Sequence, residues 1–399
     1  MMPQPVFRCN QAQTTLLVDI PASIEQGQQT SHRIKSTSAI KNPYPSTEPK
    51  GPKRDVLLAA IAPEERIYHE TLQREISTAL AEIKDCLTGD AGLSYWCHGR
   101  QGNFSEEVLP TLSLAAGRSV QASTDRTPIA PVILSSTESR NRVSSIDCLR
   151  DVAICNPTRR RMVVLEAGDV GEFFIPAGAS FIMSTLERGL PAFESARHAL
   201  FPDARPFNLM LLDPPWSNRS ARRSGVYRTS DEQAQDPFTQ AVRVVRDYLA
   251  PQGLVAVWIT NKASVRKDVI EALRPLNLGL REEWVWIKTT AHGEPVSALN
   301  GVWRRPYEIL LLFREDQHSQ QRPHRRVIAA VPDVHSRKPC LKGLLEDCQV
   351  LPPQYNALEL FARSLTAGWW SWGDEVLKFQ HESQWVRQAE QASMAADGR

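Results

Sequence analysis

The stretch FNLMLLDPPWSNRSARRSGVYRTS, residues 207–230, decides the fold class of this 399-residue chain. Its first six residues are mainly apolar, and a carboxylate, two prolines and a tryptophan follow them directly. A short apolar run bounded by turn residues predicts a buried strand of a parallel sheet. Ligands of such sheets bind beyond the carboxyl ends of the strands. We therefore expect the mouth of a binding site at Asp213–Trp216.

Strands and helices alternate on both sides of this stretch. Two β segments flank Asn156-Pro157, a buried strand follows in SFIMSTL, and further apolar strands are predicted at 207–212, 254–259, 283–289, 307–313 and 357–361. Helices are predicted in DPFTQAVRVVRDYLA, capped by Asp236, and in KASVRKDVIEALRPL. Strands joined by crossover helices favour an α/β fold with a mostly parallel sheet and helices on both faces.

The chain before this region has a different composition. Residues 1–55 are rich in Ser, Thr, Pro, Gln and Lys, and we expect this segment to be disordered because it buries too little apolar surface. Residues 56–150 are predicted to be helical and irregular, with an amphipathic helix at 63–87 that places Leu72, Ile76, Leu80, Ile83 and Leu87 on one face. The expected catalytic domain spans 151–385, and 386–399 form a tail.

Composition and motifs exclude several function classes. A net charge of +2 is too small to establish nucleic-acid binding by itself. No two of the seven cysteines form a CxxC pair, so neither a disulfide framework nor a zinc finger is indicated, and no metal is expected. The chain lacks GxGxxG, GxxxxGK[ST], HExxH and GxSxG motifs. Neither a membrane span nor a secretory signal is recognisable, which predicts an intracellular protein.

The residue types of DPPW suit methyl transfer to an exocyclic amine. The Asp213 carboxylate and the Pro214 carbonyl can accept both N–H bonds of an adenine amino group and favour its nucleophilic, pyramidal form. Pro214 and Pro215 fix the backbone so that the acceptors stay aligned. Trp216 offers an aromatic face to a base taken out of its stack. S-adenosylmethionine would supply the methyl group, because its sulfonium needs no acid to leave.

Further sequence blocks resemble the MT-A70 family of adenine-N6 methyltransferases. DPPW is followed by HSRKP at 335–339 and by LELFAR at 358–363. NGVWRRPYEILLLF and GWWSWGDEVLKFQH are most similar to the branch of that family that includes methyltransferase-like protein 4. The resemblance covers about residues 150–385. It implies a Rossmann-like, permuted S-adenosylmethionine-dependent methyltransferase sheet, in which the catalytic motif precedes the cofactor segment.

The resemblance also implies roles for residues in the matching motifs. Asp213 would meet the amino group of the cofactor's methionine moiety, Lys338 would pair with its carboxylate, and Arg363 would lie by the ribose. A lysine is a suitable point-charge partner for a carboxylate. Acidic side chains after SWG would accept hydrogen bonds from the ribose hydroxyls, and the backbone of the FIMST segment would touch the adenine. These further cofactor residues are Asp374, Glu375, Ser184 and Thr185.

Basic residues follow the catalytic motif. They and one tyrosine are candidates for contacts with phosphates or with the inserted base: Arg219, Arg222, Arg223, Tyr227, Arg228, Arg304 and Arg305. A second basic run, RPHRRV at 322–327, joins them. Trp258, Trp284 and Trp286 lie in strand patterns and are expected in the core. His335 is expected to be structural, because this reaction needs no histidine base.

Two functions remain open on this evidence. The resemblance implies an adenine-N6 methyltransferase that acts on small nuclear RNA carrying 2'-O-methyladenosine, or on DNA adenine. A non-catalytic nucleic-acid-binding scaffold subunit is the alternative, but such family members lose the DPPW carboxylate, which this chain keeps as Asp213. The substrates imply a nuclear location, no membrane partner, and a protein partner that the sequence does not identify.

Overall fold

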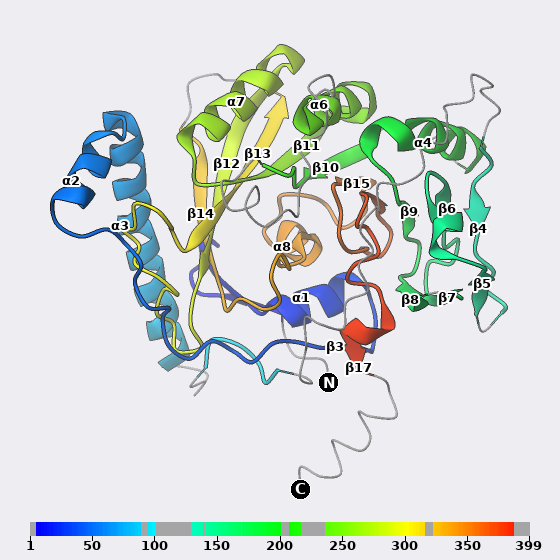
Figure 1. Cartoon of the computed structure of the whole chain (residues 1–399), viewed down its shortest axis with the longest axis horizontal. Coiled ribbons are helices and arrows are strands. Elements are labelled where there is room, and N and C mark those ends of the chain that lie inside the picture. Colours follow the sequence, from blue (N-terminus) through cyan, green and yellow to red (C-terminus); the bar gives the residue numbers. More distant parts are fainter. Residues whose placement is uncertain are drawn as a thin grey trace, which may run out of the picture. The chain divides into compact units, whose positions relative to one another are not determined.

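The structure is a computed structural model that describes residues 5–88, 95–100, 129–138, 140–168, 170–200, 207–216, 236–315 and 322–386. The chain forms two compact units (Figure 1). The first unit comprises Met1–Gly27, Arg33–Phe104 and Trp258–Leu351, and the second comprises Gln28–His32, Ser105–Val257 and Pro352–Arg399. Each unit therefore combines early and late segments, whereas the sequence predicted successive domains. Within the described residues no helix is long and apolar enough to cross a membrane.

The second unit contains the strand that ends at DPPW. Its main sheet has the order β11 (Leu249–Ile259), β10 (Phe207–Leu212), β15 (Ala357–Leu360), β16 (Trp370–Trp372), β9 (Ser180–Ile182), β6 (Ala153–Cys155) and β4 (Val132–Ile133). The pairings from β11 to β9 are parallel, β6 runs antiparallel to β9, and β4 runs parallel to β6. The expected α/β fold with a mostly parallel sheet is confirmed for this unit.

The chain reverses its direction of travel through this sheet between β10 and β15. From β10 it passes through α6 (Pro237–Tyr248) to β11 on one side, whereas from β15 it continues to β16 on the other side. Such a topological switch point leaves a crevice at the carboxyl ends of the two strands, which is where open α/β sheets bind ligands. The DPPW motif follows β10 directly, so it lies at this switch point.

Helices and a small second sheet complete the second unit. Helix α4 (Leu186–Leu200) packs against β9 and β6, and α6 packs against β10 and α4. A three-stranded sheet of β5 (Asn141–Val143), β7 (Val163–Ala167) and β8 (Gly171–Ile175) contributes to a core cluster that includes Phe173 and Phe181. The remaining short elements here are η3 (Ile146–Leu149), η5 (Glu382–Gln384) and β17 (Trp385–Val386).

The first unit is built on a mixed sheet of its own strands. Their order is β1 (Val6–Arg8), β2 (Thr15–Val18), β14 (His324–Ala330), β12 (Leu278–Lys288) and β13 (Tyr307–Glu315). The other elements are α1 (Ile20–Gly27), β3 (Arg33–Ile34), α2 (Pro52–Ala59), α3 (Pro63–Cys86), α7 (Ala263–Leu273), η4 (Arg274–Leu276) and α8 (Leu341–Asp347). Helix α3 packs against β2 and β14, and α7 packs against β12.

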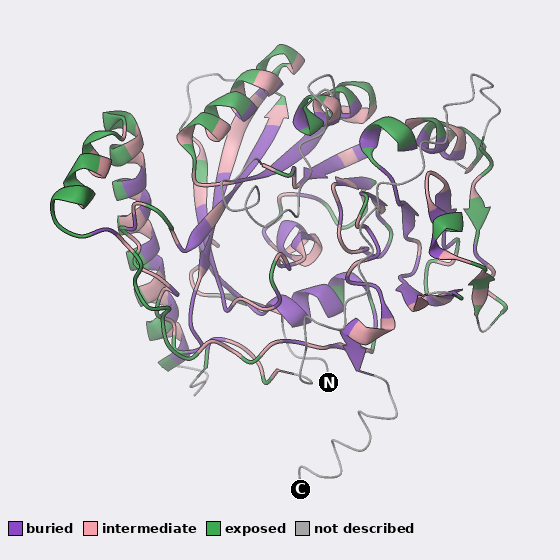
Figure 2. Cartoon of the chain, in the orientation of Figure 1, coloured by how far each residue is buried: buried purple, intermediate pink, exposed green. Residues whose placement is uncertain are grey.

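The strongly patterned elements form where the sequence predicts them. The 63–87 pattern becomes α3, which buries Leu72, Ile76 and Ile83, whereas Leu80 is half-buried. The Asp236 side chain accepts the Thr239 N–H at 3.2 Å and so caps α6 as predicted. Figure 2 shows that the strands of the sheets are mostly buried. The predicted core positions Trp258, Trp284 and Trp286 are each at most 3% exposed.

The prediction of disorder for residues 1–55 is wrong for much of that segment. Strand β2 pairs in parallel with β14, with Thr15 opposite Val327, and the side chains of Leu16, Leu17 and Val18 are buried. The segment average is polar, but the short apolar run TTLLV gains its burial from a strand that lies 300 residues away in sequence. Tertiary pairing of this kind overrides local composition.

This strand provides a test of the N-terminal packing. We expect Leu16→Ala to lower the free energy of unfolding by about 2–5 kcal/mol, because it removes a fully buried side chain and leaves a cavity. Val56→Ala, at a position that is 69% exposed in α2, is the matched control and should change it by less than about 0.5 kcal/mol. Urea unfolding of the full chain measures both. A disordered N-terminal segment would instead give no difference between the two variants.

Candidate active site

The DPPW motif leaves the carboxyl end of β10 in a tight turn. The Asp213 N–H donates to the Leu360 carbonyl at 3.4 Å, so the backbone still pairs with β15 at this residue. The Trp216 N–H donates to the Pro214 carbonyl at 2.8 Å, which folds the chain back on itself. A carbonyl oxygen has two lone pairs, so Pro214 keeps the capacity to accept a second N–H. The half-buried Trp216 ring packs against Phe238 of α6, with ring centroids 5.2 Å apart.

Four parallel strands end in one row at this edge of the second unit. Leu212 of β10 is in register with Leu360 of β15, which is in register with Trp372 of β16, which in turn faces Ile182 of β9. The residues after these four positions therefore emerge from the same edge. They include DPPW and the predicted cofactor residues of this unit, Ser184, Thr185, Arg363, Asp374 and Glu375. The structure thus brings these sequence-predicted residues to one edge of one sheet.

A close backbone approach fixes the loops at this edge. A Cβ on Gly373 would lie 2.4 Å from the Ala362 carbonyl oxygen, so no other residue fits there without a shift of the backbone. The Ala362 N–H donates to the Trp372 carbonyl at 3.1 Å. Phe361 has a φ of 62°, which non-glycine residues rarely adopt. Strained backbone of this kind persists only where its surroundings hold it, and it is common at functional sites.

Charged side chains beyond β15 and β16 are linked by ion pairs. Arg363 Nε lies 3.0 Å from Glu375 Oε2, and Lys378 Nζ lies 2.9 Å from Glu375 Oε1. Glu375 is thereby held in place by two cations. The Asp374 side chain reaches the surface, but desolvation by the surrounding protein and the like charge of Glu375 raise the pKa of its carboxyl. The edge thus presents two carboxylates and an arginine that are oriented before any ligand binds.

The Ser184 and Thr185 side chains make hydrogen bonds to other residues of the same unit. Ser184 Oγ donates to Asp151 Oδ1 at 2.5 Å, and Arg188 pairs with the other oxygen of Asp151. Thr185 Oγ1 accepts the Arg188 N–H at 3.4 Å at the start of α4. The role expected for this segment was a backbone contact, and these bonds hold its backbone in position. Sequence reasoning missed Asp151, which precedes β6 and carries no motif that marks it.

Lys338 belongs to a charged cluster in the first unit. Glu308 of β13 lies 3.5 Å from Lys338 Nζ and 2.6 Å from Lys288 Nζ, and Lys338 also lies 5.0 Å from the ring centroid of Trp258. Burial alone would raise the pKa of the Glu308 carboxyl, but the charges of the two lysines and their hydrogen bonds hold that pKa at about 2. Two lysines therefore share this one carboxylate. Lys288 lies in no recognised motif, whereas Glu308 lies in the block NGVWRRPYEILLLF, for which no site role was predicted.

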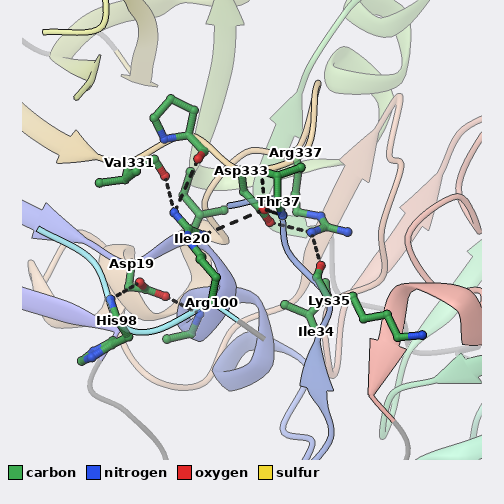
Figure 3. Close-up of polar contacts among 12 residues, drawn as sticks. Asp19, Ile20, Ile34, Lys35, Thr37, His98, Arg100, Val331, Asp333 and Arg337 are labelled. Atoms are coloured by element: carbon green, nitrogen blue, oxygen red, sulfur yellow. Dashed lines mark hydrogen bonds and ion pairs between the residues drawn. The ribbon is translucent and has the colours of Figure 1, made fainter. Parts of the chain in front are cut away.

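The segment that carries Lys338 is fixed by a buried ion pair, drawn in Figure 3. Arg337 Nη1 lies 2.5 Å from Asp333 Oδ2, and the two side chains are at most 1% exposed. The same guanidinium donates to the Lys35 carbonyl at 2.9 Å, and Asp333 Oδ1 accepts the Thr37 N–H at 3.0 Å. Arg100 donates to the Val331 carbonyl at 3.0 Å. Residues from the first hundred of the chain thus brace the segment that leads to Lys338.

The structure describes only some of the residues that were predicted to contact nucleic acid. Arg304 is exposed and Arg305 is half-buried, and both are in the first unit. In the RPHRRV run, which was expected to contact phosphates, two arginines form ion pairs within the protein: Arg325 pairs with Glu75 and Glu283, and Arg326 pairs with Glu282. The other candidates lie outside the described residues: Arg219, Arg222, Arg223, Tyr227 and Arg228.

No metal site is indicated in the part of the chain that the structure describes. There, no group of three or more His, Cys, Asp or Glu side chains is arranged to hold a metal ion. All seven cysteines have free thiols. His335, which was expected to be structural, has its Nδ1 2.9 Å from the hydroxyl of Ser336.

Residues 207–375, which begin with β10 and end at Glu375, match the MT-A70 family model. This part of the chain is similar to the MT-A70 family. The matched range runs from the strand before DPPW to the acidic pair after β16, so it includes both sides of the switch point in the second unit. The family resemblance inferred from the sequence blocks is confirmed.

Relatives share about half of the chain. It is 46% identical over 219 residues to the N6-methyladenosine RNA methyltransferase MTA1 of Cryphonectria parasitica, which covers 53% of this chain and 62% of that protein. It is 34% identical over 224 residues to the N(6)-adenine-specific methyltransferase METTL4 of Mus musculus, a match that covers 53% of this chain and 44% of that protein. It is 30% identical over 228 residues to a DNA N6-methyl methyltransferase of Caenorhabditis elegans, a match that covers 56% of this chain and 58% of that protein. The chain therefore matches less than two thirds of each relative's length.

The Glu308 cluster makes the stability of the chain sensitive to acid. Because the folded-state pKa of Glu308 lies below its ordinary value of 4.5, its ionised form stabilises the fold above that pH. This contribution, at most about 3 kcal/mol, is lost as the pH falls from about 4.5 through about 2. We expect Glu308→Gln to be less stable than the unmodified chain near pH 7, and the difference to shrink near pH 3. Urea unfolding at both values measures it, and a difference independent of pH would contradict the assignment.

Proposed function

We propose that this chain transfers the methyl group of S-adenosylmethionine to the N6 amine of adenine in RNA or DNA. The observation that carries the proposal is the position of DPPW at the carboxyl end of β10, at the topological switch point of a parallel sheet and inside the segment that matches the MT-A70 family. Two relatives support this substrate class by their names, one as an N6-methyladenosine RNA methyltransferase and the other as a DNA N6-methyl methyltransferase.

The described side chains fit this cofactor. Lys338, which the family resemblance puts at the carboxylate of the methionine moiety, is a suitable point-charge partner for that group. Asp374 and Glu375 suit the ribose diol, because carboxylates accept hydrogen bonds from hydroxyls, and Arg363 keeps Glu375 oriented. The backbone of Ser184 and Thr185 would meet the adenine ring. When bound, the cofactor supplies a methyl group on a sulfonium that leaves as a neutral thioether.

Asp213 and Pro214 would activate the substrate amine. The lone pair of an aromatic amine is delocalised into the ring, and two acceptors that bind its N–H bonds favour the pyramidal form that can attack a methyl carbon. The tight turn between Pro214 and Trp216 holds both acceptors before the base arrives, so little reorganisation is needed. As the new N–C bond forms and the old C–S bond breaks, the amine loses one proton, which Asp213 is placed to accept on its way to solvent.

Trp216 would hold the flipped base. Its indole is half-buried and packs against Phe238, so one part of the ring system is held in place. Stacking of a base on an aromatic ring is worth about 1–3 kcal/mol and is independent of base identity. Adenine selectivity would therefore depend on the acceptors Asp213 and Pro214, which match an amino group and not a carbonyl oxygen.

Asp213→Asn tests the mechanism with little change in shape. We expect its turnover to fall about a hundredfold or more, because the amide places a weaker, uncharged acceptor at the amine. The measurement is methyl transfer from labelled S-adenosylmethionine to matched RNA and DNA oligonucleotides, one of them carrying 2'-O-methyladenosine, followed by mass spectrometry of the nucleosides. Lys267→Gln, at an exposed position of α7, is the control for a change elsewhere.

The outcomes separate the enzyme from a scaffold. N6-methyladenine in the RNA pool, the DNA pool or both identifies the substrate, and turnover retained by Asp213→Asn would refute the mechanism. A scaffold would show no methylation and no thermal shift with S-adenosylmethionine. An enzyme bound to cofactor at a hundred times its dissociation constant should instead gain about 2.7 kcal/mol of stability.

We also propose that the chain acts in the nucleus, where the proposed substrates occur. The support is the substrate class, since the basic motif KGPKRD at 50–55 is short and contains only three cations. Fluorescence microscopy of the tagged chain at native expression tests it. We expect the signal to coincide with the nuclear stain, and a signal confined to the cytoplasm would refute this location.

A further inference from the structure

The loop before β13 presents an aromatic ring to solvent. Trp303 is 52% exposed, whereas Trp258, Trp284 and Trp286 of the same unit are at most 3% exposed. An indole is amphipathic and a single exposed one is not unusual. What sets Trp303 apart is that the backbone around it is held in one conformation by partners far away in sequence.

A single carboxylate organises this loop. Glu48 accepts the backbone N–H groups of three successive residues, Val302 at 2.6 Å, Trp303 at 3.2 Å and Arg304 at 3.1 Å. The turn is tight, because a Cβ on Gly301 would lie 2.2 Å from the Arg304 carbonyl oxygen. An ionised acceptor that binds several N–H groups forms strong hydrogen bonds. The indole is therefore displayed on a rigid support and not on a loose loop.

Helix α2 places cations beside the indole. Lys53 Nζ lies 5.2 Å from the centroid of the Trp303 ring, and Arg54 Nη2 donates to the Asn300 carbonyl at 2.9 Å. No side chain of α2 is buried, and Figure 2 shows the helix as an exposed element. Lys53 and Arg304 are exposed, whereas Glu48 accepts the N–H groups of the loop and lies 4.0 Å from Arg54 Nη1. The loop and α2 thus carry two exposed cations, one of which lies beside the indole.

We propose that Trp303, Lys53 and Arg304 form a platform that binds an unpaired stretch of the substrate strand. The proposal rests on the proposed function, which supplies the polynucleotide. Proteins hold single strands by combining aromatic rings, on which bases stack, with cations that follow the phosphates. The exposed ring and the two exposed cations provide both kinds of contact on one support.

The connection to β13 relates the platform to the cofactor cluster within the first unit. Residues 301–305 lead into Tyr307, the first residue of β13, and the next residue is Glu308, which pairs with Lys338 and Lys288. The Lys288 N–H also donates to the Pro306 carbonyl at 2.7 Å. The platform and the predicted carboxylate site therefore share one end of β13. This places a strand-binding surface at the edge that carries a cofactor residue.

Binding of a fluorescein-labelled single-stranded RNA oligonucleotide to the full chain tests the platform. We expect Trp303→Ala to weaken binding about fivefold or more, since stacking of one base is worth about this much, and Trp303→Phe to restore most of it. The paired variants Lys53→Gln and Arg304→Gln should each lower the slope of log affinity against log salt by about 0.7, as expected for one phosphate contact with a single strand. Lys267→Gln, exposed on α7, should leave both readouts unchanged.

Duplex RNA and single-stranded DNA complete the design. A duplex hides its base faces, so Trp303→Ala should not weaken duplex binding, whereas a DNA single strand should respond as the RNA does if stacking alone is used. Equal binding of unpaired RNA by Trp303→Ala and the unmodified chain would overturn the proposal, even if methyl transfer is observed. A loss of strand binding in a chain without methyl transfer would instead support the platform and refute the proposed function.

Discussion

The parallel register of four strands is the constraint on which the candidate site depends. Leu212, Leu360, Trp372 and Ile182 form one row across the second unit, and each strand places a different functional segment beyond that row. A shift of one strand by a single residue would turn its side chains to the other face and move its loop along the edge. The buried strands β10 and β15 resist such a shift because their apolar side chains are fully packed. Site geometry is therefore a product of core packing and not only of the loops.

Charges in this chain fall into two groups that have different uses. Arg325, Arg326 and Arg337 are each matched by carboxylates in buried or half-buried pairs, and breaking such a pair is costly because it leaves an uncompensated charge. At Glu308, in contrast, two lysines share one carboxylate. The first group joins segments that are distant in sequence, whereas in the second a single carboxylate holds two lysines in place. Both groups therefore depend on the position of a carboxylate, and not only on the presence of a lysine or arginine.

The sequence predicts those parts of the fold and site that local pattern determines. The run 207–212 is a strand with the expected bounds, α3 follows the 3.6-residue period, and Asp236 caps α6 as its sequence predicts. The N-terminal strand β2 was missed because its partner, β14, lies about 300 residues away, and no local pattern encodes that pairing. The same reason hides Asp151, Lys288 and Glu308, whose roles arise only from neighbours in space. Motifs identify ligand-binding residues, but their supporting partners require the structure.

The N-terminal segment has a physical reason to be part of the same protein as the residues that match the MT-A70 family. Glu48 organises the loop before β13, and the Lys35 carbonyl and the Thr37 N–H complete the buried Asp333–Arg337 pair before Lys338. At that pair the early segment supplies partners to charged groups that would otherwise be buried without them, at a cost of about 1–3 kcal/mol each. An early segment that only covered a hydrophobic face could be replaced by any apolar sequence. The N-terminal segment instead completes the hydrogen bonds of two loops, one before β13 and one after β14. Its sequence is therefore constrained by the geometry of those loops, and so by what they bind.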